Sequence, residues 1–439
     1  MRKGNSSIWM FLIGLGSQTQ FHLVGSLGIS EFPMFLLAPI VFFRDYRRLK
    51  DDGFMPFIWI IFLVCLGCCI SSLVNYTPFI FFLKAFAQVY ALFAATVFIH
   101  RFLAEDYSSL KWILIGILLS NFVNIFIFQP EVYTAVGGEK ASGEEAVDLM
   151  VSNVLFWSAR IKALLYILPS AFYFSTPIVL SIIMPLIASG VVIMLSQSSG
   201  RAAAACAFMS AVLIMIGQKS RKKMASIGRH IWLFLFCGLL AALVFKQAYS
   251  YAAKNGYLGD KARDKYYLQT RTGSDFLHML MAGRMELFCG VRACLHKPLL
   301  GFGPRAEDDG GYVEDYLFNY ATQEDFERYV KDRIRAQNRG EYLYVRIPTH
   351  SYISMFWVYY GILGLVIWLY VLLLFFQYFK QYAPAIPEWY GYVCLSVPAA
   401  TWDIFFSPFA ARVTIPLLVS CILIAKLASR KRDRVPYRA

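Results

Sequence analysis

Long apolar runs separated by short basic segments are the feature that most constrains how this chain folds. Of its 439 residues 58% are hydrophobic and only 16% are charged, whereas typical soluble domains have about 25% charged residues. Several runs approach the roughly 20 residues that a helix needs to cross a bilayer. The clearest runs are Phe54–Ile70, Trp112–Phe128, Ile178–Leu195, Ile231–Val244 and Ile353–Phe376. We therefore predict an all-α polytopic membrane protein and not a soluble globular domain.

The apolar runs predict about twelve transmembrane helices, with both termini in the cytoplasm. The expected spans are residues 7–24, 28–43, 54–72, 78–99, 111–129, 160–175, 177–195, 200–217, 231–249, 351–377, 389–406 and 411–427. The first two spans and the proline-containing sixth are also compatible with re-entrant or broken helices. This plan divides the chain into helices one to nine (1–249), one large loop (250–349), and helices ten to twelve with a basic tail (350–439).

Positive charge gathers in short segments between the apolar runs. The formal net charge is +14, with clusters at Arg44–Lys50, Lys219–Arg229 and Arg430–Arg438. Basic loops stay in the cytoplasm, so these clusters indicate the orientation in the membrane and argue against a nucleic-acid partner. The same rule places the large loop outside. The apolar N-terminal run lacks a clean small-residue cleavage site, which predicts a retained first helix and not a signal peptide.

The large loop has a helical pattern of its own and is predicted to be folded. Helical periodicity covers residues 275–296, a proline–glycine stop follows at 297–304, and a second amphipathic stretch covers 312–336. Its acidic and basic residues are typical of solvated helix faces with local ion pairs. The chain shows no internal repeat, no disulfide framework and no metal-binding motif among its nine cysteines.

Several basic residues fall near the predicted outer membrane surface, against the general charge bias. An ionisable side chain in a membrane helix costs about 2.5–3.5 kcal/mol on insertion scales, so each is expected to face a cavity or a partner. Arg201 follows the small polar run 196–200, where backbone amides and a guanidinium would suit a phosphate group. For Lys84, Lys246 and Arg412 the simpler interpretation is snorkelling from a helix end.

Two more candidate residues lie at the edges of the loop's helical parts. Arg284 begins the amphipathic stretch that leads to the Pro-Leu-Leu-Gly-Phe-Gly turn at 298–303. His350 ends the loop, directly before the apolar run that contains Gly361. A lone histidine is usually structural, but near pH 7 an imidazole is the natural proton acceptor. These positions make Arg284 and His350 candidates for a site at the membrane surface.

In this order, the features resemble the bacterial O-antigen ligase and O-antigen polymerase family of membrane glycosyltransferases. The resemblance rests on the twelve-span plan with its large loop, on Arg201 after Ser-Ser-Gly, on Arg284 with the 298–303 turn, and on His350 followed by Gly361. It implies a GT-C-like helical fold in the bacterial inner membrane, with a periplasmic loop. It also implies that His350 is catalytic and that Arg201 and Arg284 bind the diphosphate of an undecaprenyl-diphosphate-linked glycan, without a metal or other cofactor.

Two features depart from the family pattern. Phe288 stands four residues after Arg284, where some ligases have leucine, and residues 310–346 form an insertion in the loop. Both departures weaken the choice of a ligase over a polymerase.

The chemistry of these residues fits glycan transfer on independent grounds. Arginine forks can stabilise a departing diphosphate, and a neutral imidazole can deprotonate the attacking hydroxyl, with inversion at the anomeric carbon. The function that the resemblance implies is an O-antigen ligase that transfers glycan to lipid A-core. The alternatives are a polymerase that joins lipid-linked repeat units, and a secondary transporter or lipid-linked glycan flippase. Lys84, Lys246 and Arg412 are further candidates for contact with the substrate.

Overall fold

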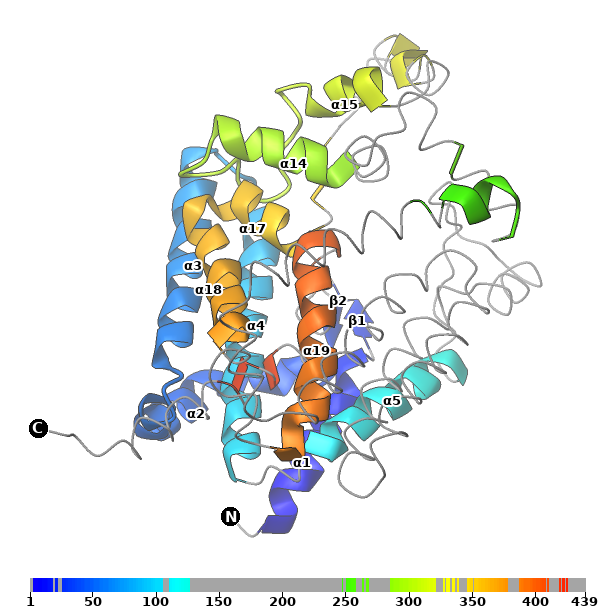
Figure 1. Ribbon diagram of the computed structural model, residues 1–439. Helices are drawn as coiled ribbons and strands as arrows, with labels where there is room; N and C mark the ends of the chain where they lie inside the picture. Colours follow the sequence, from blue (N-terminus) through cyan, green and yellow to red (C-terminus); the bar gives the residue numbers. More distant parts are fainter. Residues whose placement is uncertain are drawn as a thin grey trace, which may run out of the picture.

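The computed structural model describes residues 3–18, 20–22, 26–105, 110–126, 250–257, 285–320, 346–349, 351–377 and 387–407, with shorter pieces between 247 and 424. The elements, in chain order, are α1 (Lys3–Gln18), β1 (Gln20–His22), β2 (Ser26–Gly28), α2 (Glu31–Asp51), α3 (Met55–Val74), α4 (Phe79–Glu105), α5 (Leu110–Phe126), α14 (Met285–His296), α15 (Tyr312–Tyr320), α17 (Tyr352–Tyr360), α18 (Ile362–Gln377) and α19 (Pro387–Phe406). The described part is mostly helical, and Figure 1 shows a bundle with a smaller layer, α14 and α15, across one end.

The first predicted span is shorter than expected, and a small hairpin follows it. α1 ends at Gln18, and β1 pairs antiparallel with β2 before α2 begins. The prediction of one helix over 7–24 is therefore wrong, while the described part of the chain is mostly helical, as predicted. The cause lies in Gln18, Gln20 and His22, whose polar side chains interrupt the apolar helical pattern.

α3 and α4 form the centre of the bundle. Both are long and apolar enough to cross a membrane, over Met55–Val74 and Phe79–Leu103. Each begins one residue after the predicted span, at Met55 and Phe79. Shorter apolar helices occur at Ser6–Gly16 and Ile362–Gln377. The described residues thus contain two helices of membrane-spanning length, while the predicted spans between 160 and 217 lie outside the described residues.

α2 packs along α4 in the same direction, so both helices end at the same end of the bundle. The Tyr90 hydroxyl donates a hydrogen bond to the Phe35 carbonyl at 2.9 Å near the start of this contact. Further along, Arg101 Nη1 lies 2.7 and 2.6 Å from the two carboxylate oxygens of Asp45. Arg101 is buried, so its charge is paired inside the protein and does not add to the solvated basic surface.

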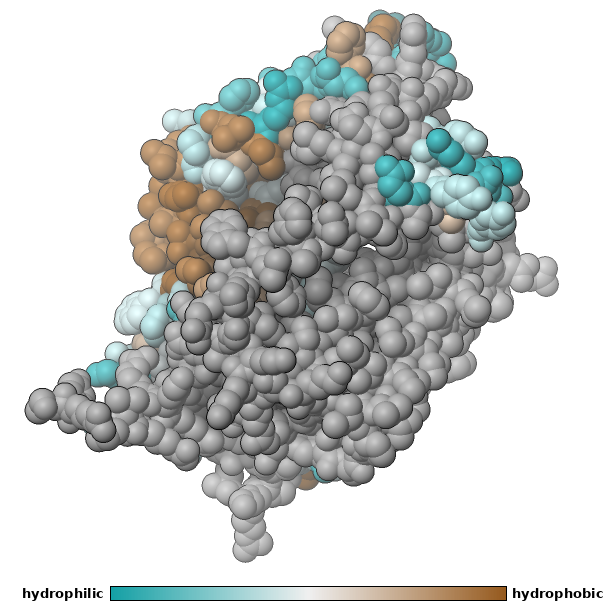
Figure 2. All heavy atoms as spheres, viewed as in Figure 1, coloured by the Kyte–Doolittle hydropathy of each residue, from teal (hydrophilic) through white to brown (hydrophobic). Residues whose placement is uncertain are grey.

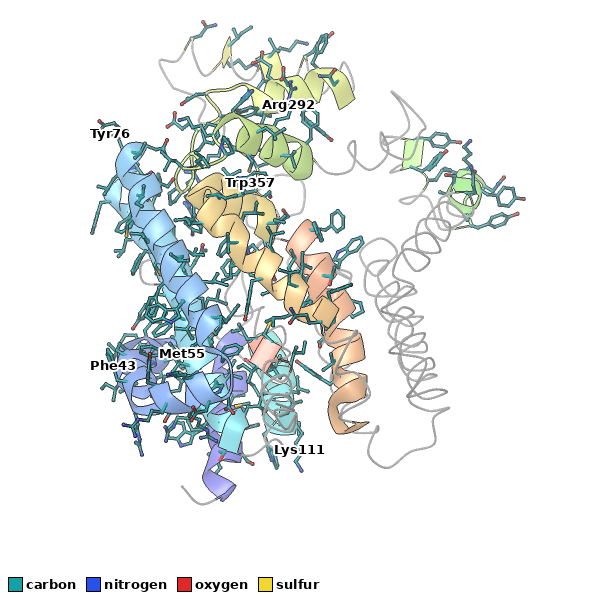
Figure 3. All side chains as sticks on the ribbon, turned by 60° about the vertical axis from the view of Figure 1, so that its left-hand side comes forward. Phe43, Met55, Tyr76, Lys111, Arg292 and Trp357 are labelled. Atoms are coloured by element: carbon teal, nitrogen blue, oxygen red, sulfur yellow. The ribbon has the colours of Figure 1, made fainter. Side chains whose placement is uncertain are left out.

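The next contact at this end involves His100. Its Nε2 lies 3.0 Å from the Asp52 carboxylate, and its ring stacks on Phe54. We call this end, where α2 carries Arg44–Lys50, the basic end of the bundle. We call the opposite end, at Asn75–Phe79, the module end. Figure 3 shows Tyr76 at the module end and Met55 and Phe43 toward the basic end.

α1 crosses α5 at two glycines. A Cβ atom on Gly14 would overlap the carbonyl of Ile113, and one on Gly116 would overlap that of Phe11. Small residues allow helix backbones to approach this closely. The crossing therefore requires glycine at both positions and fixes α1 against the bundle.

The tenth predicted span, 351–377, is two helices. α17 stops at Gly361, whose φ of +67° is a conformation that glycine adopts without strain. α18 then folds back, because Tyr352 and Phe356 of α17 both have ring centroids 5.0 Å from that of Trp368 on α18. The prediction of one helix over 351–377 is therefore wrong. Apolar periodicity does not reveal a single residue with a positive φ.

Large apolar side chains cover the outside of the bundle over α2, α3 and the start of α4. They include Leu36, Ile40, Phe43, Trp59, Leu66, Leu73 and Phe79. Figure 2 shows this apolar surface beside hydrophilic residues of the α14–α15 layer. A 20-residue helix such as α3 is about 30 Å long, which matches the hydrocarbon thickness of a bilayer.

Candidate functional site: the junction between the loop module and the bundle

Residues 285–320 and 346–349 of the large loop form a compact unit at the module end. We call α14, the turn 297–304, α15 and the segment 346–349 the loop module. Its core contains Cys289, Cys294, Tyr312 and Ile347, and it also contains Val358 of α17. Other residues of α17 belong to the core of the bundle. α17 therefore lies between two apolar cores, and the loop is a folded extension of the bundle.

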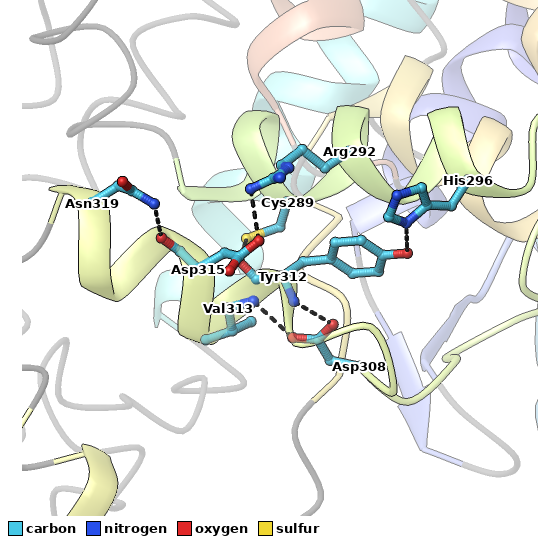
Figure 4. A network of polar contacts seen from close by, with 8 residues as sticks. All are labelled: Cys289, Arg292, His296, Asp308, Tyr312, Val313, Asp315 and Asn319. Carbon is cyan, nitrogen blue, oxygen red and sulfur yellow. Dashed lines mark hydrogen bonds and ion pairs between the residues drawn. The ribbon is translucent and has the colours of Figure 1, made fainter.

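A network of polar contacts fixes α15 against α14 inside the module (Figure 4). The Asp308 carboxylate accepts hydrogen bonds from the backbone N–H groups of Tyr312 at 2.9 Å and Val313 at 2.7 Å, and so caps α15. Arg292 of α14 forms an ion pair with Asp315 at 2.6 Å. His296 Nδ1 lies 2.7 Å from the Tyr312 hydroxyl. The Arg292–Asp315 contact is a local ion pair of the kind that the mixed charge of the loop predicted, whereas the cap and the His296–Tyr312 contact were not predicted.

Burial keeps two nucleophilic groups of the module in their neutral forms. Burial raises the pKa of the Cys294 thiol to about 12, so this cysteine is unreactive near pH 7. Burial, and then the nearby Asp308 carboxylate, raise the pKa of the Tyr312 hydroxyl. The protonated hydroxyl can therefore donate its hydrogen bond to His296. Both groups serve the structure of the module and not a reaction.

The glycine turn of the module interlocks with the break between α17 and α18. Phe302 N–H donates to the Val358 carbonyl at 2.7 Å, and Ile362 N–H donates to the Leu299 carbonyl at 3.1 Å. A Cβ atom on Gly361 would overlap the Leu299 carbonyl, and one on Gly301 would lie 2.5 Å from the Val358 carbonyl. The Pro-Leu-Leu-Gly-Phe-Gly turn and the glycine that follows His350 in the sequence are thus the two halves of one contact.

The same turn is held to the end of α3. Asn75 Nδ2 donates to the carbonyls of Ser71 at 2.8 Å and Gly301 at 3.2 Å, and Asn75 Oδ1 accepts from Lys297 Nζ at 3.2 Å. A Cβ atom on Gly303 would overlap Thr77. The turn therefore joins α3, α17 and α18 at one point, and neither side of this joint tolerates a larger residue at its glycines.

The segments on both sides of His350 pack against α14. A Cβ atom on Gly290 of α14 would lie 2.9 Å from Ser354 Cβ and 3.8 Å from the Pro348 carbonyl. Ser351 is the N-cap of α17, and its hydroxyl accepts a hydrogen bond from Ser354 N–H at 3.0 Å. Gly290 is six residues after Arg284, or about 9 Å along a helix. The chain that flanks His350 therefore meets the helix that follows Arg284.

Most of the predicted site residues lie outside the described residues. These are Arg201, Lys246, Arg284, His350 and Arg412. Lys84 is described, and it lies half-buried on α4, one turn after Phe81 at the module end. The structure therefore describes the junction through residues that are close in sequence to Arg284 and His350.

Two arginines near Lys84 escaped the sequence analysis. Arg305 and Arg346 both lie over the ring of Phe81. In the sequence they belong to a long segment of mixed charge, where no pattern distinguishes one arginine from another. Their common partner is distant in the chain, so only the fold brings them together.

Comparison with known proteins identifies no relative of this chain. No protein-family model matches the chain, and no curated protein matches it. Within the residues that the structure describes, no group of three His, Cys, Asp or Glu side chains is placed to hold a metal ion. The functional argument therefore rests on the chain itself.

Proposed function

We propose that this protein is a multi-span membrane glycosyltransferase of the O-antigen ligase type. It would move a glycan from undecaprenyl diphosphate to lipid A-core at the periplasmic face of the bacterial inner membrane. The observation that carries the proposal is the interlock of Leu299–Phe302 with the α17–α18 break. It joins the sequence segment that begins at Arg284 to the one that begins at His350, and these are the segments on which the family resemblance depends.

The proposed place in a membrane is supported by the surface and the ends of the bundle. Exposed apolar side chains cover α2, α3 and the start of α4, as expected of a lipid-facing surface. The basic cluster Arg44–Lys50 and the loop module lie at opposite ends of the α3–α4 pair. This is the arrangement that a cytoplasmic basic end and a periplasmic module would produce.

The proposed site lies at the junction, with His350 as general base. The imidazole would take the proton of the acceptor hydroxyl, whose oxygen forms the new glycosidic bond as the bond from the anomeric carbon to the diphosphate oxygen breaks. Arg201 and Arg284 would bind the departing diphosphate through paired N–H donors. Lys84, Lys246 and Arg412 would add positive charge around it. No metal ion or other cofactor has a role in this proposal.

The decisive test is turnover of the His350→Ala variant in a reconstituted assay with lipid-linked donor and acceptor. A general base contributes about 10² to 10⁴ in rate, so we expect turnover to fall by this factor while donor binding persists. His296→Ala is the matched control, because it removes another histidine of the loop whose partner, Tyr312, is structural. Normal turnover of His350→Ala would disprove the assignment, and an equal loss of donor binding would make His350 a ligand of the diphosphate.

The arginine roles have a separate test. Arg201→Lys keeps the charge but loses the planar fork that binds two phosphate oxygens at once. We expect it to lose most of the activity in the same assay, together with affinity for the donor. Full activity of the lysine variant would reduce Arg201 to a packing or snorkelling residue.

The polymerase alternative shares the donor and differs in the acceptor. A deletion strain separates the two by its glycan profile. Uncapped core with accumulated long lipid-linked polymer indicates a ligase, whereas core capped with a single repeat indicates a polymerase. An unchanged cellular glycan profile would contradict both.

A further inference from the structure

The module end carries two arginines that are not assigned to His350 or the diphosphate. The guanidinium carbons of Arg305 and Arg346 lie 5.4 and 5.5 Å from the centroid of the Phe81 ring. Both arginines are exposed. Among the described residues, no ion pair neutralises either of them. Two positive charges therefore lie beside the first turns of α4.

The backbone holds the two arginines together. Ile347, which follows Arg346, donates its N–H to the carbonyl of Ala306, which follows Arg305, at 3.2 Å. Glu307 and Arg346 form an isolated antiparallel bridge. The two guanidinium carbons are thus no farther apart than the sum of their distances to the ring centroid. Because both side chains are exposed, both can reach one anion bound beside the ring.

The backbone of Arg305 points to a role for its side chain. Its φ is +56°, a left-handed conformation that glycine adopts freely and that costs free energy for other residues. The chain has glycine at other left-handed positions of this loop, including Gly301, Gly303 and Gly311. Arginine at this position therefore supplies a guanidinium group, although glycine would adopt this backbone conformation with less strain.

The surroundings of the cations match a membrane surface. Tyr76 and Phe79 are 91% and 73% exposed beside the start of α4. Aromatic side chains are enriched at the level of the lipid headgroups, where lipid phosphates lie. Guanidinium groups bind phosphate oxygens in pairs, and an aromatic ring beneath them orients the fork.

We propose that Arg305 and Arg346 bind the headgroup phosphate of an anionic phospholipid in the leaflet around the module end. The proposal relies on the membrane placement argued under the proposed function, but not on glycan transfer. The bound lipid would tie the segments at Arg305 and Arg346 to α4, at a second point besides the Leu299–Phe302 contact.

The test measures lipid binding to the purified full-length protein in detergent, with phosphatidylglycerol and phosphatidylcholine as probes. We expect phosphatidylglycerol to bind at least about 10-fold more tightly, and Arg305→Gln with Arg346→Gln to remove that preference. Lys111→Gln is the matched control, because Lys111 also lies over an aromatic ring, that of Trp112 at 5.6 Å, toward the other end of the bundle (Figure 3). Its affinity should stay within about twofold of the unmodified protein.

Several outcomes would overturn the proposal. These are an unchanged lipid preference in the double variant, an equal loss in Lys111→Gln, and competition by inorganic pyrophosphate as strong as that by the lipid. Displacement of phosphatidylglycerol by undecaprenyl diphosphate would assign the cations to the donor instead. His350→Ala should retain the lipid. A failed lipid site would therefore leave glycan transfer intact, and a failed glycosyltransferase would leave the lipid site intact.

Discussion

The arginines that pack against α4 or belong to it differ between the two ends of the α3–α4 pair. At the basic end, Arg101 is buried next to the Asp45 carboxylate, although Arg44, Arg47 and Lys50 of the same end are exposed. At the module end, Arg305 and Arg346 are exposed and rest on an aromatic ring. The charge of Arg101 is satisfied inside the protein, so its consequence is stability. The charges of Arg305 and Arg346 stay available to a ligand, so their consequence is binding.

The ends also differ in what holds the elements together. The Arg101–Asp45 ion pair connects α4 to α2 at the basic end, beside the contact of His100 with Asp52. At the module end, close backbone contacts at glycines and a cluster of neutral hydrogen bonds connect the turn to α3, α17 and α18. Breaking a buried ion pair leaves an uncompensated charge, and crowding a glycine displaces a backbone segment. Substitutions in the ion pair and at the glycines can therefore test the two kinds of contact separately.

The largest expected effect is all-or-none labelling across the membrane. A cysteine in place of Asp309, which is exposed in the loop module, should react with an impermeant maleimide added outside the inner membrane. A cysteine in place of Lys222 should be protected until the membrane is opened. Native Cys294 is the internal control, since burial raises its pKa to about 12 and it should not react. The reverse pattern would invert the orientation of both ends.

The next effect concerns the buried ion pair of the basic end. Arg101→Ala should lower the free energy of unfolding by about 3–5 kcal/mol, because Asp45 would keep a buried charge without its partner. Arg292→Ala removes an arginine from the Asp315 pair, whose side chains are 45% and 49% exposed, and should cost about 0–1 kcal/mol. Denaturation of the purified variants measures both. Similar values would mean that burial does not distinguish the two pairs.

A smaller effect is expected from the glycine contact of the module end. Gly361 and Gly311 have the same φ of +67°, but only Gly361 has neighbouring atoms within 4 Å of an added Cβ. Alanine at Gly311 should cost about 1 kcal/mol for the backbone conformation alone. Alanine at Gly361 should cost about 2–4 kcal/mol, because the Leu299 carbonyl must also move. Equal costs would show that the close contact contributes nothing.

The smallest effect should be a gain. Arg305→Gly relieves a left-handed residue and should raise the stability of lipid-free protein by up to about 1 kcal/mol. Arg305→Gln loses the same charge but keeps a Cβ atom, so it should give no gain. A stability loss in the glycine variant would mean that the arginine contributes more to folding than to binding.

Sequence reasoning located the starts of α3 and α4 well, but it ended the second span at 43, whereas α2 continues to Asp51 and includes the basic cluster. The starts of α3 and α4 fall within one residue of the prediction, because an unbroken apolar run has a clear beginning. It missed the β1–β2 hairpin and the break at Gly361. Both depend on short-range backbone geometry, which a 20-residue hydropathy pattern averages away.

The candidate site was only partly accessible from the sequence. Gly361 and the 298–303 turn were recognised as separate motifs, but nothing in the sequence indicates that they touch. Arg305 and Arg346 were invisible for a related reason, since their shared partner Phe81 lies in another part of the chain. Contacts between distant segments carry no local pattern, so the fold has to supply them.

The position of α17 between two apolar cores has a consequence for genetics. Val358 faces the core of the loop module, whereas Tyr352, Phe356 and Tyr360 face the core of the bundle. Because α17 is packed on both sides, it cannot accommodate a substitution on one side by moving into solvent. Destabilising mutations should therefore map to both cores beside α17, and suppressors of one core mutation should arise across α17 in the other core.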